Sequence, residues 1–112
     1  MLTDEQIFAA SDLKEQIVEV PEWGGSVTLR QITRKQQATC REQSTKAGEL
    51  DIDELELRLL IEHMVSPDIG QDRIEQLRGR NGVVLKRLAD AMYALNGTGA
   101  GALEDALATF LG

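Results

Sequence analysis

Few side chains in this sequence have the types and spacing that chemistry requires. His63 is the only histidine and Cys40 the only cysteine, whereas a zinc site needs about four His, Cys or carboxylate ligands. Arg41 could lower the pKa of the neighbouring Cys40 thiol, but no histidine is close in sequence to act as its base. The serines occur in none of the known nucleophile motifs. We therefore predict a protein that is not an enzyme and that holds no metal and no cofactor.

Two further motifs are similar to ligand sites but lack essential residues. Asp51–Glu54 hints at a calcium loop, yet the EF-hand pattern requires glycine where this chain has Glu56. Gly97–Gly99 is similar to a dinucleotide-binding turn, but the third glycine of that pattern falls on Ala102 and no strand precedes it. We interpret the first motif as helix-capping acids and the second as a linker.

The composition is that of an acidic chain of 112 residues with a formal net charge of −7, long enough for one domain with a modest core. That charge repels phosphate backbones and anionic lipids unless a separate basic patch exists. No apolar run approaches the roughly 20 residues of a membrane span, and the acidic start is unlike a secretory signal. The lone cysteine fits a reducing compartment. We expect a cytoplasmic protein without nucleic-acid or membrane partners.

The clearest predicted element of structure is a β-hairpin over about residues 14–32. Apolar and polar residues alternate on both sides of a turn that contains a proline, the only tryptophan and the only Gly-Gly pair. The register that brings apolar residues together pairs Val20 with Val27 and Val18 with Leu29.

Capping boxes predict where three helices begin, because a Thr or Asp is followed three positions later by Gln or Glu. The pairs are Thr3 with Gln6, Thr33 with Gln36, and Asp53 with Glu56.

The predicted helices surround one apolar core helix. A short first helix is followed by a polar helix from Arg34 to about Lys46, which Ala47-Gly48 ends. A core helix then runs from Asp53 to Val65 and stops at Ser66-Pro67. A short helix with Ile74 and Leu77 and an amphipathic helix from Val84 to Leu95 follow. We predict an α+β, mainly α fold, with an N-terminal β-hairpin packed on a small bundle of about four to five helices. Residues 1–97 form a single globular domain (hairpin about 14–32, helices about 33–96), and residues 98–112 a flexible joint that can carry one more helix.

Seven apolar residues are candidates for contact with a partner protein: Trp23, Leu88, Met92, Leu95, Leu103, Leu107 and Phe110. Trp23 is either a small core plug or an exposed anchor, since tryptophan is enriched at interface hot spots. The other six lie on two helical stripes that form either a groove for an amphipathic helix or simply the core. Packing in the core is favoured for Leu88 and Met92.

Charged residues are unevenly distributed along the chain. Residues 30–46 and 73–87 are mainly basic, whereas residues 49–62 are mainly acidic. Such runs are either solvated helix faces or surfaces that guide protein–protein docking. A helix-turn-helix over residues 73–87 would bind DNA, but its second helix is basic only at Lys86 and Arg87.

The sequence resembles the tail assembly chaperones of long-tailed bacteriophages. The specific part of the resemblance is Val18-Glu19-Val20-Pro21-Glu22-Trp23-Gly24-Gly25-Ser26-Val27. The similarity spans about residues 15–97. It includes the strand Thr28–Arg30 and the polar helix. It also includes the core helix, which ends in Val65-Ser66-Pro67-Asp68, and the amphipathic helix, which ends in Ala94-Leu95-Asn96-Gly97. Residues 98–112 match no motif of the family.

The resemblance implies a non-enzymatic role in the infected bacterial cell and absence from the mature virion. Such chaperones bind the tape-measure protein, keep its hydrophobic helices soluble and help tail-tube subunits to polymerise around it. In many of these phages a ribosomal frameshift also makes an extended form, which is associated with recruitment of the tail-tube protein. A homo-oligomer is compatible with this role. The alternatives are a structural head–tail completion or neck protein of the virion and, with less support, a small DNA-binding regulator.

Overall fold

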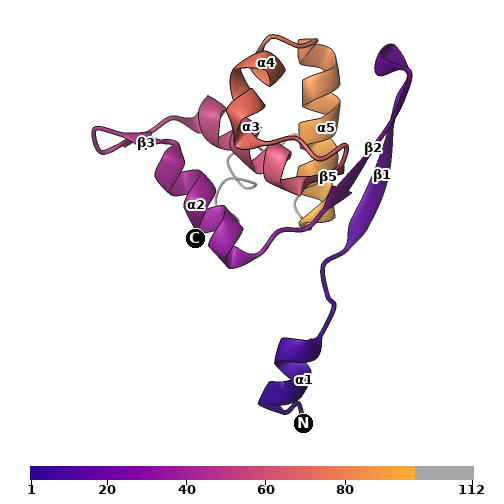
Figure 1. The fold of residues 1–112 in the computed structure, drawn as a ribbon, viewed down its shortest axis with the longest axis vertical. Helices are drawn as coiled ribbons and strands as arrows, with labels where there is room; N and C mark the ends of the chain where they lie inside the picture. The colour runs from indigo at the N-terminus through magenta and orange to yellow at the C-terminus, as the bar shows by residue number, and fades with distance from the viewer. Residues whose placement is uncertain (98–112) are drawn as a thin grey trace.

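The structure is a computed structural model that describes residues 1–97, and the predicted partner-binding residues Leu103, Leu107 and Phe110 lie outside the described residues. The elements follow the order α1 (Asp4–Ala9), β1 (Glu15–Val20), η1 (Pro21–Trp23), β2 (Gly25–Arg30), α2 (Arg34–Gln43), β3 (Thr45–Lys46), β4 (Glu49–Leu50), α3 (Ile52–His63), β5 (Met64–Ser66), η2 (Gln71–Arg73), α4 (Ile74–Arg78) and α5 (Gly82–Leu95). Helices cluster on one side of a small antiparallel sheet (Figure 1). The predicted α+β, mainly α class is confirmed.

The hairpin forms where predicted, but its register differs from the prediction by two residues. Val18 pairs with Val27, and Val20 pairs with Gly25. The loop is shorter than expected because η1 turns the chain within four residues, with the Gly24 N–H donating to the Pro21 carbonyl at 3.0 Å and Gly24 at a φ of +79°. A shift of two residues keeps every side chain on its face, so the apolar residues of both strands still face the core.

The core helix begins and ends earlier than predicted. Its N-cap is Asp51, whose carboxylate accepts the Glu54 N–H at 3.1 Å, so the predicted cap at Asp53 is wrong. The helix ends at His63, and the next three residues form β5. This strand pairs antiparallel with β2 and makes β2 the central strand of the order β1-β2-β5. The β2 edge of the hairpin thereby gains β5 as a hydrogen-bonding partner, which a longer α3 could not supply.

The polar helix also ends earlier than predicted. α2 begins at the predicted capping box of Thr33 and Gln36 and ends at Gln43. Ala47 and Gly48 do not cap it. They form the turn of the small β3–β4 hairpin, both with positive φ, a conformation that glycine adopts at no steric cost.

The core lies between the inner face of the sheet and the helices α3, α4 and α5. α3 packs against α2, α4 and α5, while α5 packs against β1. The largest fully buried apolar side chains are Val20, Leu29, Leu55, Leu59, Leu60, Ile61, Val84, Leu88 and Met92. The helical stripes predicted for residues 53–65 and 84–95 therefore supply most of the core.

A polar network fastens α3 to its neighbours. The buried carboxylate of Glu54 accepts from Arg58 Nη2 and from Lys46 Nζ, both at 3.2 Å. Arg58 Nη1 donates to Gln71 Oε1 at 3.2 Å, and Gln71 Nε2 donates to Glu62 Oε2 at 3.0 Å. The network thus joins α3 to β3 and η2.

His63 is fully buried where α3 passes into β5. Its Nδ1–H donates to the Leu59 carbonyl at 2.7 Å, and its Nε2 accepts from the Asn96 amide at 3.0 Å. The same Asn96 nitrogen donates to the Met92 carbonyl at 2.8 Å, which fixes the orientation of the amide. Because the Asn96 amide donates to Nε2, this nitrogen carries no proton and the imidazole is neutral. Burial also lowers the pKa of His63 below its ordinary value of 6.5.

This burial predicts a pH dependence of stability. The folded protein keeps His63 neutral while the unfolded chain protonates it below pH 6.5, so unfolding takes up a proton and acid favours unfolding. We expect the free energy of unfolding to fall between pH 7 and pH 5 with a slope that approaches about 1.4 kcal/mol per pH unit. Urea titrations of wild type and His63→Leu across this range measure it. The variant should lose the slope, and an unchanged slope would contradict the assignment.

The N-terminal arm, residues 1–13, extends away from the body of the protein (Figure 1). Lys14, the next residue, is held to the body by two hydrogen bonds with Gln31, each of 2.9 Å. α1 has the predicted capping box of Thr3 and Gln6, yet none of its residues is buried. Leu2, Ile7 and Phe8 are all exposed, and Phe8 retains 87% of its accessible surface. The arm is therefore a helical segment whose apolar side chains have nothing to pack against within residues 1–97.

Candidate functional site

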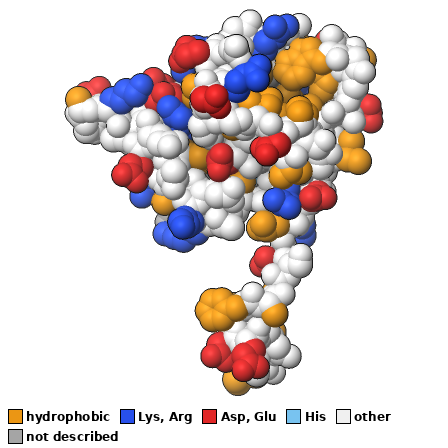
Figure 2. Space-filling view, in the orientation of Figure 1, with side chains coloured by type: hydrophobic (Ala, Val, Ile, Leu, Met, Phe, Trp, Pro, Cys, Tyr) orange, Lys and Arg blue, Asp and Glu red, His pale blue; other side chains and the backbone are white. Residues whose placement is uncertain are grey.

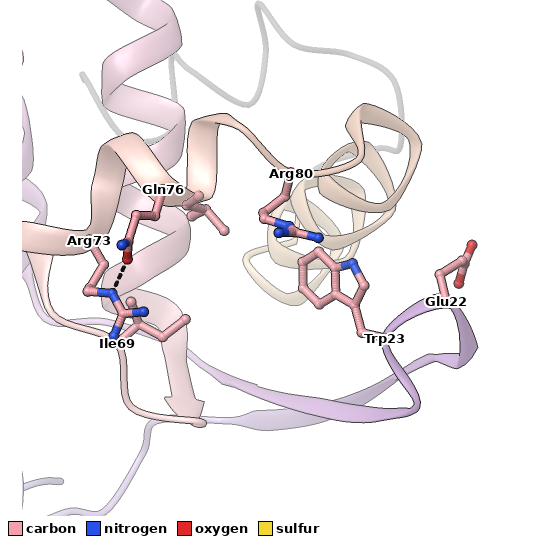
Figure 3. Close-up of a pocket in the computed structure, with 7 residues that line it drawn as sticks. Glu22, Trp23, Ile69, Arg73, Gln76 and Arg80 are labelled. Atoms are coloured by element: carbon pink, nitrogen blue, oxygen red, sulfur yellow. Dashed lines mark hydrogen bonds between the residues drawn. The ribbon is translucent and has the colours of Figure 1, made fainter.

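A concave surface lies between the tip of the β1–β2 hairpin and α4. We call it the Trp23 hollow. It has a volume of about 810 Å³ and is lined by Glu22, Trp23, Ile69, Arg73, Gln76, Leu77 and Arg80. Figure 3 shows these side chains converging from the hairpin tip and from the segment around α4.

Trp23 reaches this position because η1 turns the hairpin tip toward the helices. The indole retains 38% of its accessible surface. A smaller hollow of about 230 Å³ lies beside it and is lined by Val20, Trp23, Gly25, Ser26, Val27, Met64, Pro67 and Ile69. Trp23 and Ile69 line both hollows and so form the wall between them. The indole is thus partly packed and partly exposed to solvent.

An ion pair holds the hairpin tip on α5. Glu22 accepts from Arg87 through both carboxylate oxygens, at 2.7 and 2.5 Å, in the bidentate geometry that carboxylates and guanidinium groups favour. The hydrogen bond from Arg87 lowers the pKa of Glu22 to about 2. Glu22 is therefore charged at all pH values above the strongly acidic range, so the ion pair with Arg87 persists at neutral pH.

Arginines form the rim of the hollow. Arg73 donates to Gln76, and the Arg80 side chain points toward the indole of Trp23 (Figure 3). Figure 2 shows an apolar patch with blue side chains beside it at this end of the molecule. An apolar wall of Trp23, Ile69 and Leu77 beneath a basic rim suits a segment that is both apolar and acidic, because each part of such a segment meets its complement.

The structure distributes the predicted partner-binding residues unevenly. Leu88 and Met92 are fully buried in the core, and Leu95 is partly buried against it. Of the four predicted residues that lie within residues 1–97, only Trp23 lines the hollow. Sequence reasoning missed that Ile69 and the buried Leu77 line a hollow together with Trp23, although the basic run at residues 73–87 indicated a charged surface. Finding the hollow required the contact between the hairpin tip and α4, which are about fifty residues apart.

The residues considered for catalysis do not form a reactive site. Burial raises the pKa of the Cys40 thiol to about 12, opposite to the lowering that Arg41 could have caused. Within residues 1–97, no group of three or more His, Cys, Asp or Glu side chains is arranged to hold a metal ion. In the same part of the chain, no helix has the length and apolarity to cross a membrane.

Comparisons with known proteins return no similarity. No protein-family model matches the chain. A search of curated proteins found no significant match, and neither did a search of solved structures.

Proposed function

We propose that this protein is a non-enzymatic tail assembly chaperone of a long-tailed bacteriophage. It acts in the cytoplasm of the infected cell, binds the tape-measure protein and helps tail-tube subunits to assemble around it. The Trp23 hollow is the observation that carries the proposal, since it offers an aromatic anchor in a concave apolar surface with a basic rim. The residues Glu22 and Trp23 that build it belong to the run on which the resemblance to this family depends.

The hollow suits a helical client for a physical reason. A tape-measure protein exposes amphipathic helices before the tube covers them, and such helices bind grooves through a few apolar anchors. An aromatic side chain of the client can lie against the indole, and acidic residues beside it can pair with Arg73 and Arg80. Contacts of this kind at the centre of an interface usually dominate its affinity.

The charges of the second helix give less support to the DNA-binding alternative. Lys86 pairs with Asp90 at 3.1 Å, and Arg87 pairs with Glu22. These are the two basic residues that a helix-turn-helix would direct toward phosphates. Most of the charge on that surface is therefore already neutralised by carboxylates of the same chain.

Co-expression with the tape-measure protein of the same phage tests the proposal. We expect the wild-type chain to move the tape-measure protein into the soluble fraction, and Trp23→Ala to abolish that effect. Because the indole is only partly buried, the substitution should lower the free energy of unfolding by about 2 kcal/mol, less than the 3–5 kcal/mol of a buried tryptophan. Urea denaturation measures this loss.

Val83→Ala is the matched control, because it shortens an exposed apolar side chain on α5 outside the hollow. It should solubilise the tape-measure protein as the wild type does. A tape-measure protein that stays equally insoluble with and without the wild-type chain would overturn the proposal. Detection of this chain in purified particles would instead favour a head–tail completion or neck protein.

A further inference from the structure

We propose that the N-terminal arm of one copy binds in the Trp23 hollow of a second copy of this chain, so that two copies exchange arms. The inference concerns the protein alone in solution and does not depend on the function proposed above. The arm and the client proposed there bind the same hollow, so a bound client would displace the arm.

The arm has the character of a segment that packs on something. α1 contains six residues, whereas isolated helices shorter than about 12–15 residues are marginal in water. It nevertheless carries a complete capping box and three exposed apolar side chains, Leu2, Ile7 and Phe8. A helix this short gains most of its stability from burying such a face against a partner surface.

Charge complementarity favours the Trp23 hollow as that surface. Residues 1–13 contain Asp4, Glu5 and Asp12 and no lysine or arginine. The rim of the hollow carries Arg73 and Arg80, while the one carboxylate among its lining residues, Glu22, is already paired with Arg87. In Figure 2 the arm shows apolar and acidic side chains together, whereas the opposite end shows apolar and basic ones.

The open shape of the hollow leaves room for a helix. A six-residue helix is about 9 Å long and about 10 Å wide, and the hollow is open to solvent over a volume of about 810 Å³. A helix of this size can therefore lie on the hollow with Phe8 against the indole of Trp23.

The topology favours a second copy over the arm's own hollow. The arm leaves the start of β1, while the hollow lies at the hairpin tip, where β1 ends (Figure 1). Residues 10–13 link α1 to Lys14, which is held by Gln31, and four residues span at most about 14 Å. β1 has six residues and is therefore about 20 Å long, so the arm does not reach its own hollow by running back along β1. β1 is an edge strand, and two copies that lie antiparallel along it place each arm beside the partner's hairpin tip.

Sedimentation equilibrium of the full chain over a range of concentrations tests this inference. We expect a reversible dimer, and Phe8→Ser should raise its dissociation constant by about 30-fold or more, as for an aromatic hot spot. Phe8 has no contact with the body of the protein that the substitution could disturb, so circular dichroism should be unchanged. Val83→Ser, which alters another largely exposed apolar residue, should dimerise like the wild type.

A reciprocal pair of variants separates arm from hollow. Asp4→Lys/Glu5→Lys and Arg73→Glu/Arg80→Glu should each be monomeric, and a chain with all four substitutions should dimerise again because the charges are exchanged. A wild type that stays monomeric at all concentrations, or a Phe8→Ser variant that dimerises normally, would overturn the inference. Neither result would alter the outcome of the co-expression experiment.

Discussion

We expect Leu60→Asp to leave the protein unfolded at 25 °C. Leu60 retains 1% of its accessible surface and lies in the middle of α3. Losing a buried leucine costs about 2–5 kcal/mol, and burying an unpaired carboxylate adds several more. The sum is comparable to the roughly 5–15 kcal/mol that stabilises a small domain. Circular dichroism and a thermal melt measure the result.

Ile52→Asp is the control for this substitution. It makes the same kind of chemical change on the same helix, but at a position with 45% of its surface exposed. Ile52 is the first residue of α3, where a carboxylate interacts favourably with the helix dipole. This variant should melt near the wild-type temperature. Near-native melting of Leu60→Asp as well would show that α3 does not form the core.

The second large effect is expected from Arg58→Ala, which should lower the free energy of unfolding by about 3 kcal/mol. The Glu54 carboxylate is almost fully buried, and Arg58 is its one well-buried cationic partner among the described residues, since Lys46 is mostly exposed. Removing one member of a buried pair leaves the other charge uncompensated, which costs about 3–5 kcal/mol. Because Arg58 is partly exposed, we expect a loss of stability at the lower end of this range. Urea denaturation at pH 7 measures it.

A double-mutant cycle identifies the cause of that loss. Arg58→Met/Glu54→Leu replaces the buried pair with apolar side chains of similar size, and such replacements are often neutral or stabilising. The double variant should therefore be more stable than Arg58→Met alone. If the two substitutions are simply additive, the loss comes from packing of the arginine stem and not from the unpaired carboxylate.

Local signals in the sequence were sufficient for much of the fold. The Thr3 and Thr33 capping boxes form as predicted, because a cap needs only side chains within one turn. The stripes that contain Leu59 and Leu88 are buried as their helical spacing indicates. The hairpin forms because alternation and a Pro-Gly turn are also local features.

The errors occur where partners distant in sequence decide the outcome. Met64–Ser66 has the apolar pattern of a helix end, yet β2 offers it a hydrogen-bonding edge, and so it becomes a strand. The register of the hairpin depends on how tightly η1 turns. The Trp23 hollow depends on Ile69 and Leu77 meeting the hairpin tip. None of these pairings has a signature within a single window of sequence.

The central position of β2 has a consequence for synthesis of the chain. A two-stranded hairpin alone is marginally stable in water, and here its third strand is made about 35 residues later. While the ribosome is still adding those residues, β1 and β2 expose an unpaired edge and the apolar face that α5 later covers. Native order therefore waits until nearly all of residues 1–97 have emerged, and the nascent chain is briefly as dependent on protection from aggregation as the clients proposed for the finished protein.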